Sequence, residues 1–163
     1  IFDDNGQEVP TPGTGRIFVG AATQFEGYTG GGTKEFIDGL MASGDVGHFD
    51  DEGRLYIDGR DDDMIVSGGE NVFPLEVENL LAGHPAVVET SVIGVDDDEF
   101  GKRLRAFVVR RPDTDLDADA VKSYVRAELA RHKVPRDVVF VDVLPRNETG
   151  KVLKTQLAKM AEQ

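Results

Sequence analysis

Short apolar runs separated by glycine and aspartate dominate the first 58 residues. The run at 15–20 is bounded by glycines, and apolar positions alternate on both sides of residues 50–53. Alternation with a period of two is typical of half-buried strands, so we predict a strand at 15–20 and a hairpin that turns around 50–53. Glycines 30–32 lack the Gly-Lys-Ser/Thr ending and the following helix of a phosphate-binding loop. We interpret them as an ordinary loop.

Beyond residue 58, short apolar runs alternate with segments that have helical spacing. The predicted strands lie at 64–66, 86–95, 103–110 and 137–143. The predicted helices span about 75–82, about 118–131 and a short stretch from about 153. Pro74 suits the start of the first helix and Gly83 its end. This order predicts an α+β fold, in which a small C-terminal domain with a short mixed sheet and about three helices follows a β-rich segment.

The helical spacing also predicts which side chains face the core. In the middle helix these are Val121, Tyr124, Val125 and Leu129. In the first and last helices they are Leu75, Leu80, Leu81, Leu153, Leu157 and Met160. Three consecutive aspartates at 61–63 are costly to bury, so we expect them at the surface.

Composition narrows the class of protein. The 163 residues are 39% hydrophobic and 30% charged, which favours a folded domain over a disordered chain. No apolar run approaches the ~20 residues that span a membrane, and the first residues lack the features of a secretory leader. We expect a cytoplasmic protein, with peripheral membrane association as the alternative. Because no Met precedes Ile1, we expect a fragment of a longer protein.

Two further observations limit the chemistry. There is no cysteine, which excludes disulfides and thiol nucleophiles, and the three histidines form no metal-ligand pattern. The net charge of −13 argues against nucleic-acid binding. Yet residues 121–163 hold nine Lys or Arg and five Asp or Glu, so the C-terminal stretch is basic. That charge indicates either an anionic small-molecule partner or solvated helix faces.

Four segments, in this order, carry the candidate chemistry: 43–60, 61–78, 129–136 and 144–151. Their sequences include SGD, DGRDDD, SGGENVFPLEVE, RHKVPR and LPRNETGK. Together they resemble the C-terminal part of the adenylate-forming enzymes, which include acyl- and aryl-CoA synthetases, peptide-synthetase adenylation domains and luciferase. The SGGENVFPLEVE form at 67–78 is closest to that of fatty-acyl-CoA synthetases.

The resemblance implies an AMP-forming acid–thiol ligase that binds ATP, CoA and a carboxylic acid, here a fatty acid. In such enzymes the acid is adenylated, a small C-terminal domain rotates, and CoA displaces AMP. It implies that residues 1–59 end a large N-terminal domain, 60–62 form the hinge and 63–163 form the mobile domain. Because the acyl pocket, the triphosphate loop and the Mg²⁺ ligands would lie in the absent large domain, we expect no turnover from this chain alone. Two alternatives remain, an aryl-CoA or other carboxylate-activating ligase and a non-catalytic binding or regulatory module of the same fold.

The resemblance also implies roles for single residues. Lys151 matches the adenylation lysine, which contacts the acyl carboxylate and the α-phosphate. Asp45 and Arg60 match the residues that bind the nucleotide ribose and phosphate, although Arg60 is also suited to pair with a following aspartate. Asp62 matches the hinge residue, with Asp61 as the neighbouring alternative.

The remaining matches concern CoA. Gly68 and Gly69 match the loop that lines the pantetheine tunnel, where a backbone without Cβ leaves room for a narrow chain. Glu70 would orient this loop, without an assigned chemical role. Residues matching the segment near the CoA nucleotide are Arg131, His132, Lys133 and Arg136. The same basic residues are equally suited to complementing the C-terminal end of a helix.

Overall fold

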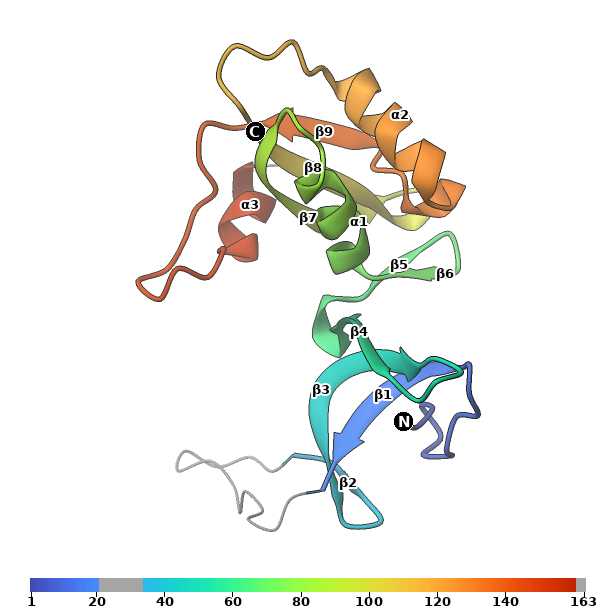
Figure 1. The fold of residues 1–163 in the computed structure, drawn as a ribbon. Helices are drawn as coiled ribbons and strands as arrows, with labels where there is room; N and C mark the ends of the chain where they lie inside the picture. Colours follow the sequence, from blue (N-terminus) through green and yellow to red (C-terminus); the bar gives the residue numbers. More distant parts are fainter. Residues whose placement is uncertain (21–33, 161–163) are drawn as a thin grey trace. The chain divides into compact units, whose positions relative to one another are not determined.

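A computed structural model of the protein describes residues 1–20 and 34–160. The chain divides into two compact units, Ile1–Asp63 and Met64–Gln163 (Figure 1). The predicted loop at glycines 30–32 lies outside the described residues.

The first unit is built on a four-stranded antiparallel sheet. Its strands are β1 (Thr14–Val19), β2 (Phe36–Ile37), β3 (Leu40–Phe49) and β4 (Leu55–Arg60). The long strand β3 pairs with each of the other three. The strand and the hairpin predicted for this part of the chain are therefore confirmed. A 3-10 helix, η1 (Asp61–Asp63), follows β4, and none of its three aspartates is buried.

The second unit contains a mixed three-stranded sheet in the order β7-β8-β9. Its strands are β7 (Val87–Asp97), β8 (Gly101–Arg110) and β9 (Asp137–Phe140). Strands β7 and β8 are antiparallel, whereas β8 and β9 are parallel. The helix α2 (Ala118–Glu128) lies in the connection between the parallel pair, as a parallel crossover requires. The α+β class and the short mixed sheet are confirmed.

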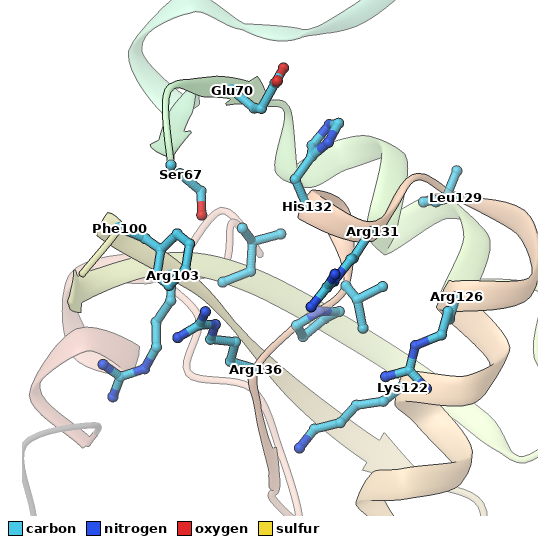
Figure 2. A pocket seen from close by; sticks show the side chains of 14 residues that line it. Ser67, Glu70, Phe100, Arg103, Lys122, Arg126, Leu129, Arg131, His132 and Arg136 are labelled. Atoms are coloured by element: carbon cyan, nitrogen blue, oxygen red, sulfur yellow. The ribbon is translucent and has the colours of Figure 1, made fainter. Parts of the chain in front are cut away.

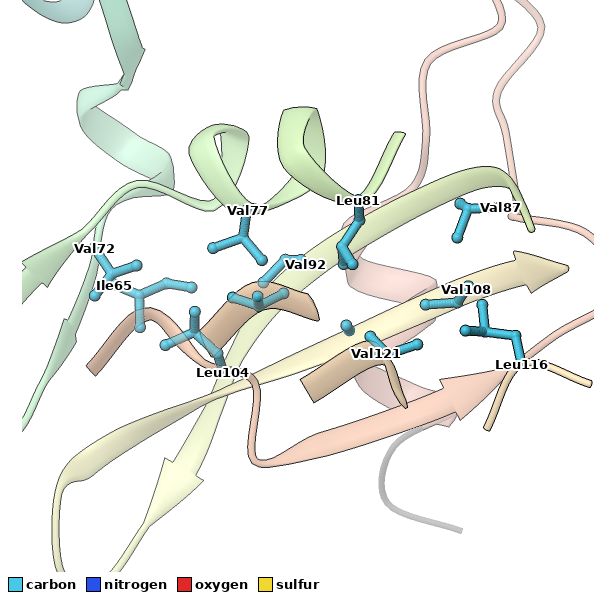
Figure 3. Close-up of a cluster of buried hydrophobic side chains, with 12 residues drawn as sticks. Ile65, Val72, Val77, Leu81, Val87, Val92, Leu104, Val108, Leu116 and Val121 are labelled. Atoms are coloured by element: carbon cyan, nitrogen blue, oxygen red, sulfur yellow. The ribbon is translucent and has the colours of Figure 1, made fainter. Parts of the chain in front are cut away.

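Alternation along the strands gives this sheet two apolar faces. One face forms the larger core, where α2 and the helix α1 (Pro74–Ala82) cover the sheet (Figure 3). Fully buried side chains in this core include Val77, Leu81, Val92, Leu104, Val121 and Val125. On the other face, Leu157 of α3 (Lys154–Met160) packs with Phe107 and Leu144. These two cores hold α1, α2 and α3 in place around the sheet.

The helix starting at Pro74 begins as predicted, but one of its three expected core residues differs. Leu81 is fully buried, whereas Leu75 is 37% exposed. The face toward the sheet is set by Pro74, Val77 and Leu81 at spacings of three and four. Leu75 lies two positions before Val77, about 200° around the helix, and so points away from the core. In α3, Met160 is likewise exposed, and Leu157 alone is buried.

In the second unit, the middle helix is shorter than predicted, and one strand was missed. Helix α2 ends at Glu128, because Leu129 adopts an extended backbone. A separate 3-10 helix, η2 (Arg131–Lys133), follows it. Near the start of the unit, β5 (Ile65–Ser67) pairs with β6 (Glu70–Val72) in a short hairpin. The pattern of Glu70–Val72 resembles a loop, and its strand conformation depends on pairing with β5.

Candidate active site

In the first unit, three predicted site residues lie together. Asp45 on β3 is the register partner of Arg60 at the end of β4. The Arg60 Nη1 lies 3.4 Å from Asp45 Oδ1, and its Nε donates to Asp62 Oδ1 over 3.1 Å. The hydrogen bond to Asp62 is the main cause that raises the pKa of Arg60, and Asp45 contributes to it. The ribose and hinge roles of these residues stay predictions, as does the role of Asp61.

Gly44 contributes to this cluster, although the motif analysis passed over it. Its φ of +88° is a conformation that glycine adopts easily. A Cβ at Gly44 would lie 3.1 Å from the Arg60 guanidinium. Gly44 therefore leaves room for the Arg60 guanidinium beside β3, next to Asp45. The sequence could have indicated this role, because Gly44 is the middle residue of the SGD segment.

In the second unit, Gly68 and Gly69 form the turn of the β5–β6 hairpin. Both have positive φ, +60° and +85°. Gly68 donates its amide to the carbonyl oxygen of Phe100 over 3.0 Å, and a Cβ at Gly68 would lie 2.9 Å from the Phe100 ring. A Cβ at Gly69 would meet nothing within 4 Å. Of the two positions, only that of Gly68 excludes a side chain because of a neighbouring group, the Phe100 ring.

Gly68 lines a pocket of about 1210 Å³ within this unit. Figure 2 shows its basic side chains, which come from β8, α2, η2 and the segment after η2. These basic residues are Arg103, Lys122, Arg126, Arg131, His132 and Arg136. Glu70 is the acidic residue in the lining. Such a pocket is suited to a ligand that carries several negative charges.

Three of the four predicted CoA-contact residues line this pocket: Arg131, His132 and Arg136. Lys133 is not among the lining residues, and its Nζ lies 2.6 Å from Glu76 Oε2. That ion pair joins η2 to the first turn of α1. In this structure the Lys133 ammonium therefore links two elements of the fold and does not face the pocket. Neither Gly69 nor Lys151 lines the pocket.

Helix α2 supplies two basic residues that motif reasoning missed. Lys122 and Arg126 lie at positions i and i+4, so they share one face of the helix. Within residues 1–20 and 34–160, no carboxylate lies within ion-pair distance of Lys122, Arg126 or Arg131. Their charges are therefore available to a ligand. The i, i+4 spacing of these two residues can be read from the sequence, but the sequence analysis of this helix considered only its apolar face.

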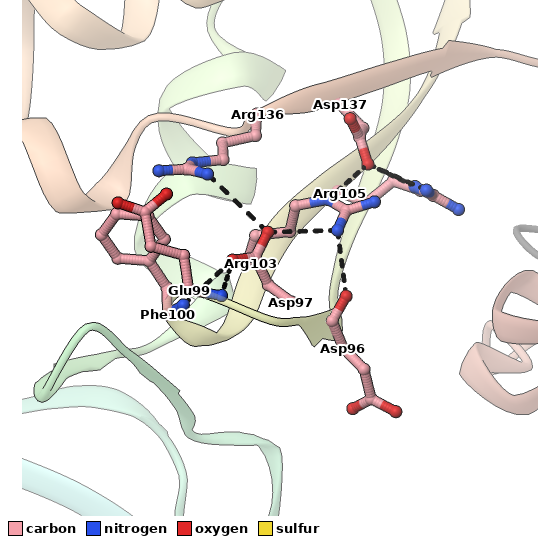
Figure 4. Close-up of polar contacts among 8 residues, drawn as sticks. All are labelled: Asp96, Asp97, Glu99, Phe100, Arg103, Arg105, Arg136 and Asp137. Carbon is pink, nitrogen blue, oxygen red and sulfur yellow. Dashed lines mark hydrogen bonds and ion pairs between the residues drawn. The ribbon is translucent and has the colours of Figure 1, made fainter.

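The turn between β7 and β8 supports the other side of the pocket (Figure 4). Asp97 Oδ1 accepts hydrogen bonds from the amides of Phe100 and Glu99, over 2.9 and 3.1 Å. The bond from the Phe100 amide is the main cause that lowers the pKa of Asp97. The Arg136 guanidinium lies over the Phe100 ring at 3.9 Å, with its Nη1 3.7 Å from Asp97 Oδ2. This turn thus positions Arg136 at the pocket.

Lys151 lies in an exposed loop between β9 and α3. The loop is closed by Asn147, whose Oδ1 accepts from the amides of Thr149 and Lys151 over 3.1 and 2.8 Å. The Asn147 amide in turn donates to the Lys151 carbonyl oxygen over 2.9 Å. Gly150 has φ +84°, and the side chain of Lys151 is exposed. The sequence motif therefore forms a compact turn that presents the lysine to solvent.

Among the described residues, no group of three or more His, Asp or Glu side chains is placed to hold a metal ion. In the same residues, no helix combines the length and apolar character needed to cross a membrane.

Residues 76–151 match the family named AMP-binding enzyme C-terminal domain. The chain carries such a domain. It belongs to the adenylate-forming acyl-CoA ligase superfamily. The match runs from the first turn of α1 to Lys151 and includes the basic pocket residues from Arg103 to Arg136.

Individual relatives extend the similarity to nearly the whole chain. Indoleacetate–CoA ligase of Aromatoleum aromaticum is 39% identical over 163 residues, which are 98% of this chain and 32% of the relative. Long-chain-fatty-acid–CoA ligase FadD13 of Mycobacterium tuberculosis is 45% identical over 122 residues, 75% of this chain and 24% of the relative. The crystal structure of ATP-bound MatB from Rhodopseudomonas palustris matches with a TM-score of 0.86 and 36% identity, covering 99% of this chain and 33% of that one. The chain thus spans about a third of the length of the indoleacetate–CoA ligase and of MatB.

Proposed function

We propose that this chain is the C-terminal part of an AMP-forming acyl-CoA ligase, which adenylates a carboxylic acid and then transfers the acyl group to CoA. The observation that carries the proposal is that one small domain of this family presents both an exposed lysine loop and a separate cationic pocket. The two features suit the two steps. The lysine serves the first, and the pocket serves the second.

In the first step, Lys151 stabilises charge. Attack of the carboxylate on the α-phosphate of ATP builds negative charge on the phosphoryl oxygens, and an ammonium group lowers the energy of that transition state. The side chain is flexible and exposed, so it can be presented to a nucleotide and then withdrawn. Asp45 and Arg60 would bind the ribose and phosphate of the same nucleotide.

In the second step, the pocket would hold the nucleotide end of CoA. Its phosphates carry several negative charges, and Arg126, Arg131 and Arg136 present guanidinium groups that bind phosphate oxygens through paired hydrogen bonds. His132 offers a ring for stacking on the adenine. Gly68, at the edge of the same pocket, would let the pantetheine chain pass close to the backbone.

We propose a fatty acid as the substrate. The SGGENVFPLEVE segment and the 45% identity to a long-chain-fatty-acid–CoA ligase support this class. An aryl acid is the second candidate, favoured by the 39% identity to an indoleacetate–CoA ligase over almost the whole chain. Mg²⁺ would neutralise charge on the ATP phosphates, and we propose that its ligands lie in the missing large domain, as does the acyl pocket.

The decisive experiment uses the full-length protein and separates the two half-reactions. Lys151→Ala should slow acyl-adenylate formation about 100-fold or more, because one electrostatic donor is lost. It should leave thioester formation from pre-made acyl-adenylate nearly unchanged. Lys159→Ala, which removes an exposed lysine of α3, is the matched control. Equal losses in both half-reactions, or no ligase activity with any fatty or aryl acid, would contradict the proposal.

A second measurement concerns the chain by itself. We expect the 163-residue chain to show no carboxylate-dependent pyrophosphate exchange, because it supplies one lysine and part of a ribose site but no triphosphate loop. Measurable exchange by this chain would overturn that part of the proposal.

A further inference from the structure

The loop that carries Lys151 is anchored at its base and exposed at its tip. Leu144 at its start is 2% exposed in the smaller core. At the other end, the Leu153 amide donates to the carbonyl oxygen of Pro145 over 2.8 Å, and Arg146 forms a backbone bridge with Val152. Residues 146–151 between these anchors are all exposed. The position of the tip therefore depends on the few contacts that its own residues make.

Most contacts of the tip are internal and do not locate it relative to the sheet. Asn147 binds the backbone of Thr149 and Lys151, as described above, and the Gly150 amide donates to the Asn147 carbonyl oxygen over 2.9 Å. These bonds give the turn its shape. A turn with a fixed shape can still move as a unit about its base.

One side chain joins the tip to the sheet. Arg146 donates through Nη1 to the carbonyl oxygen of Gly150 over 2.6 Å, and through Nη2 to Oε2 of Glu89 on β7. In the described parts of the chain, no other side-chain hydrogen bond or ion pair links residues 146–151 to the sheet. Gly150 directly precedes Lys151, so the guanidinium connects a carboxylate of the sheet to the peptide that carries the lysine.

We propose that Glu89 is a positioning residue for Lys151, acting through Arg146. The inference rests on the proposed function. A planar guanidinium binds both acceptors in one geometry, so the carboxylate on β7 sets where the Gly150 carbonyl lies. Gly150 itself permits many backbone conformations, and a Cβ there would meet nothing within 4 Å, so local sterics do not restrain it. None of the four sequence segments that carry the family resemblance contains Glu89.

If Glu89 positions Lys151, removing its carboxylate should change the rate of adenylation much more than the stability of the fold. The Glu89 and Arg146 side chains are 28% and 44% exposed, and ion pairs this accessible contribute little to folding. Rates, in contrast, are sensitive to small displacements of a catalytic group. Loss of the contact should therefore slow the step that uses Lys151 while the protein stays folded.

The test uses Glu89→Ala in the full-length protein. Adenylation should fall about 10-fold, through kcat and with little change in the KM for ATP, because a displaced lysine affects the transition state more than ground-state binding. Thioester formation from pre-made acyl-adenylate should not change. Glu148→Ala is the matched control, since Glu148 is an exposed acidic residue of the same tip and its side chain makes no hydrogen bond or ion pair with another described residue. That control should keep both half-reactions at the wild-type rate.

A double mutant tests whether Glu89 acts through Arg146. If it does, Glu89→Ala should cause no further loss in an Arg146→Gln background, so the two effects would be non-additive. Fully additive losses would show that Glu89 acts by another route and would overturn the proposal. Equal losses in both half-reactions, or no loss in either, would overturn it too.

Crystal structures give a readout that does not depend on activity. In the full-length protein, the loop of residues 146–151 should be displaced relative to β7, or have higher relative B-factors, in Glu89→Ala but not in Glu148→Ala. A loop in the wild-type position with unchanged B-factors would contradict the tether even if the rates fell. If the wild-type protein made no acyl-adenylate, the proposed function would fail, while the crystal structures would still decide whether Glu89 holds the loop. An active wild type together with unaltered kinetics of Glu89→Ala would contradict this inference alone.

Discussion

Gly68 donates its amide to the carbonyl oxygen of Phe100, and the Phe100 ring occupies the space that a side chain at Gly68 would need. The ring also carries the Arg136 guanidinium at 3.9 Å. Phe100 therefore contacts two parts of the pocket edge, the glycine turn of the β5–β6 hairpin and a basic side chain from the segment before β9. Both belong to the surface that we propose for CoA.

Alanine substitution of Gly68 and of Gly69 should distinguish the effect of the close contact with Phe100 from the effect of backbone strain. Both Gly68→Ala and Gly69→Ala impose a positive φ on a residue with Cβ, at a cost of about 1 kcal/mol. Gly68→Ala must also displace the Phe100 ring, so we expect it to cost more in unfolding free energy and to slow thioester formation more. Denaturant unfolding and the second half-reaction measure this. Equal effects at both positions would contradict the packing argument.

Neutralising Arg126 should weaken CoA binding specifically. Arg126→Gln removes a charge at the pocket that has no ion-pair partner among the described residues, so we expect the KM for CoA to rise about tenfold, or ~1.4 kcal/mol. The KM for ATP should not change. Lys159→Gln, outside the pocket lining, controls for net charge. A rise in both KM values, or in the control, would argue against a CoA site here.

Acid should destabilise the second unit through its arginine-bound aspartates. Burial raises the pKa of Asp137, but hydrogen bonds from Arg105 and Arg103 outweigh it and lower the value overall, as the Phe100 amide does for Asp97. A carboxyl whose pKa is lower in the folded state stabilises the fold above its unfolded pKa of about 4, and this contribution is lost as pH falls through the folded value. The unfolding free energy should therefore decline below about pH 5.

The comparison variant for acid stability is Asp97→Asn, which keeps an oxygen acceptor but cannot titrate. It should be less stable than the wild type at neutral pH, and the difference should shrink as pH falls. Urea unfolding at several pH values measures both curves. Parallel curves for variant and wild type would show that Asp97 does not contribute to the acid response.

A proline at Asp62 should test the proposed hinge. Asp62→Pro fixes φ near −65°, so it should slow overall turnover more than either half-reaction measured alone. Asp62→Ala is the control, because it removes the contact with Arg60 but leaves the backbone free. Identical kinetics for Asp62→Pro and wild type in the full-length protein would rule out a hinge at this position.

Some features of this fold follow from local pattern. The hairpin around residues 50–53 and the helix after Pro74 were predicted because turn residues and apolar periodicity act over short distances. Leu75 was assigned to the wrong environment because the apolar face of a short helix depends on which side meets the sheet. Strand β6 was missed for a similar reason, since its polar residues are extended only through pairing with β5.

The candidate site divides in the same way. The family resemblance pointed to Arg131, His132 and Arg136, which line the pocket, but it also included Lys133, which the fold turns toward Glu76. Lys122 and Arg126 escaped notice because nothing in a single helix shows that its polar face borders a pocket. Their place in the pocket lining depends on η2 and β8 lying beside α2.

By itself, the sequence determined the three helices, most of the strands, the glycine turns and the loop that presents Lys151, because these depend on backbone conformations and spacings within a few residues. The tertiary structure alone decided which charges face a common pocket and which are neutralised by ion pairs. It also placed Glu89 beside Arg146, 57 positions apart in the chain. The physical reason is that electrostatic and packing energies depend on distances in space, and residues far apart in sequence acquire those distances only when the sheet assembles.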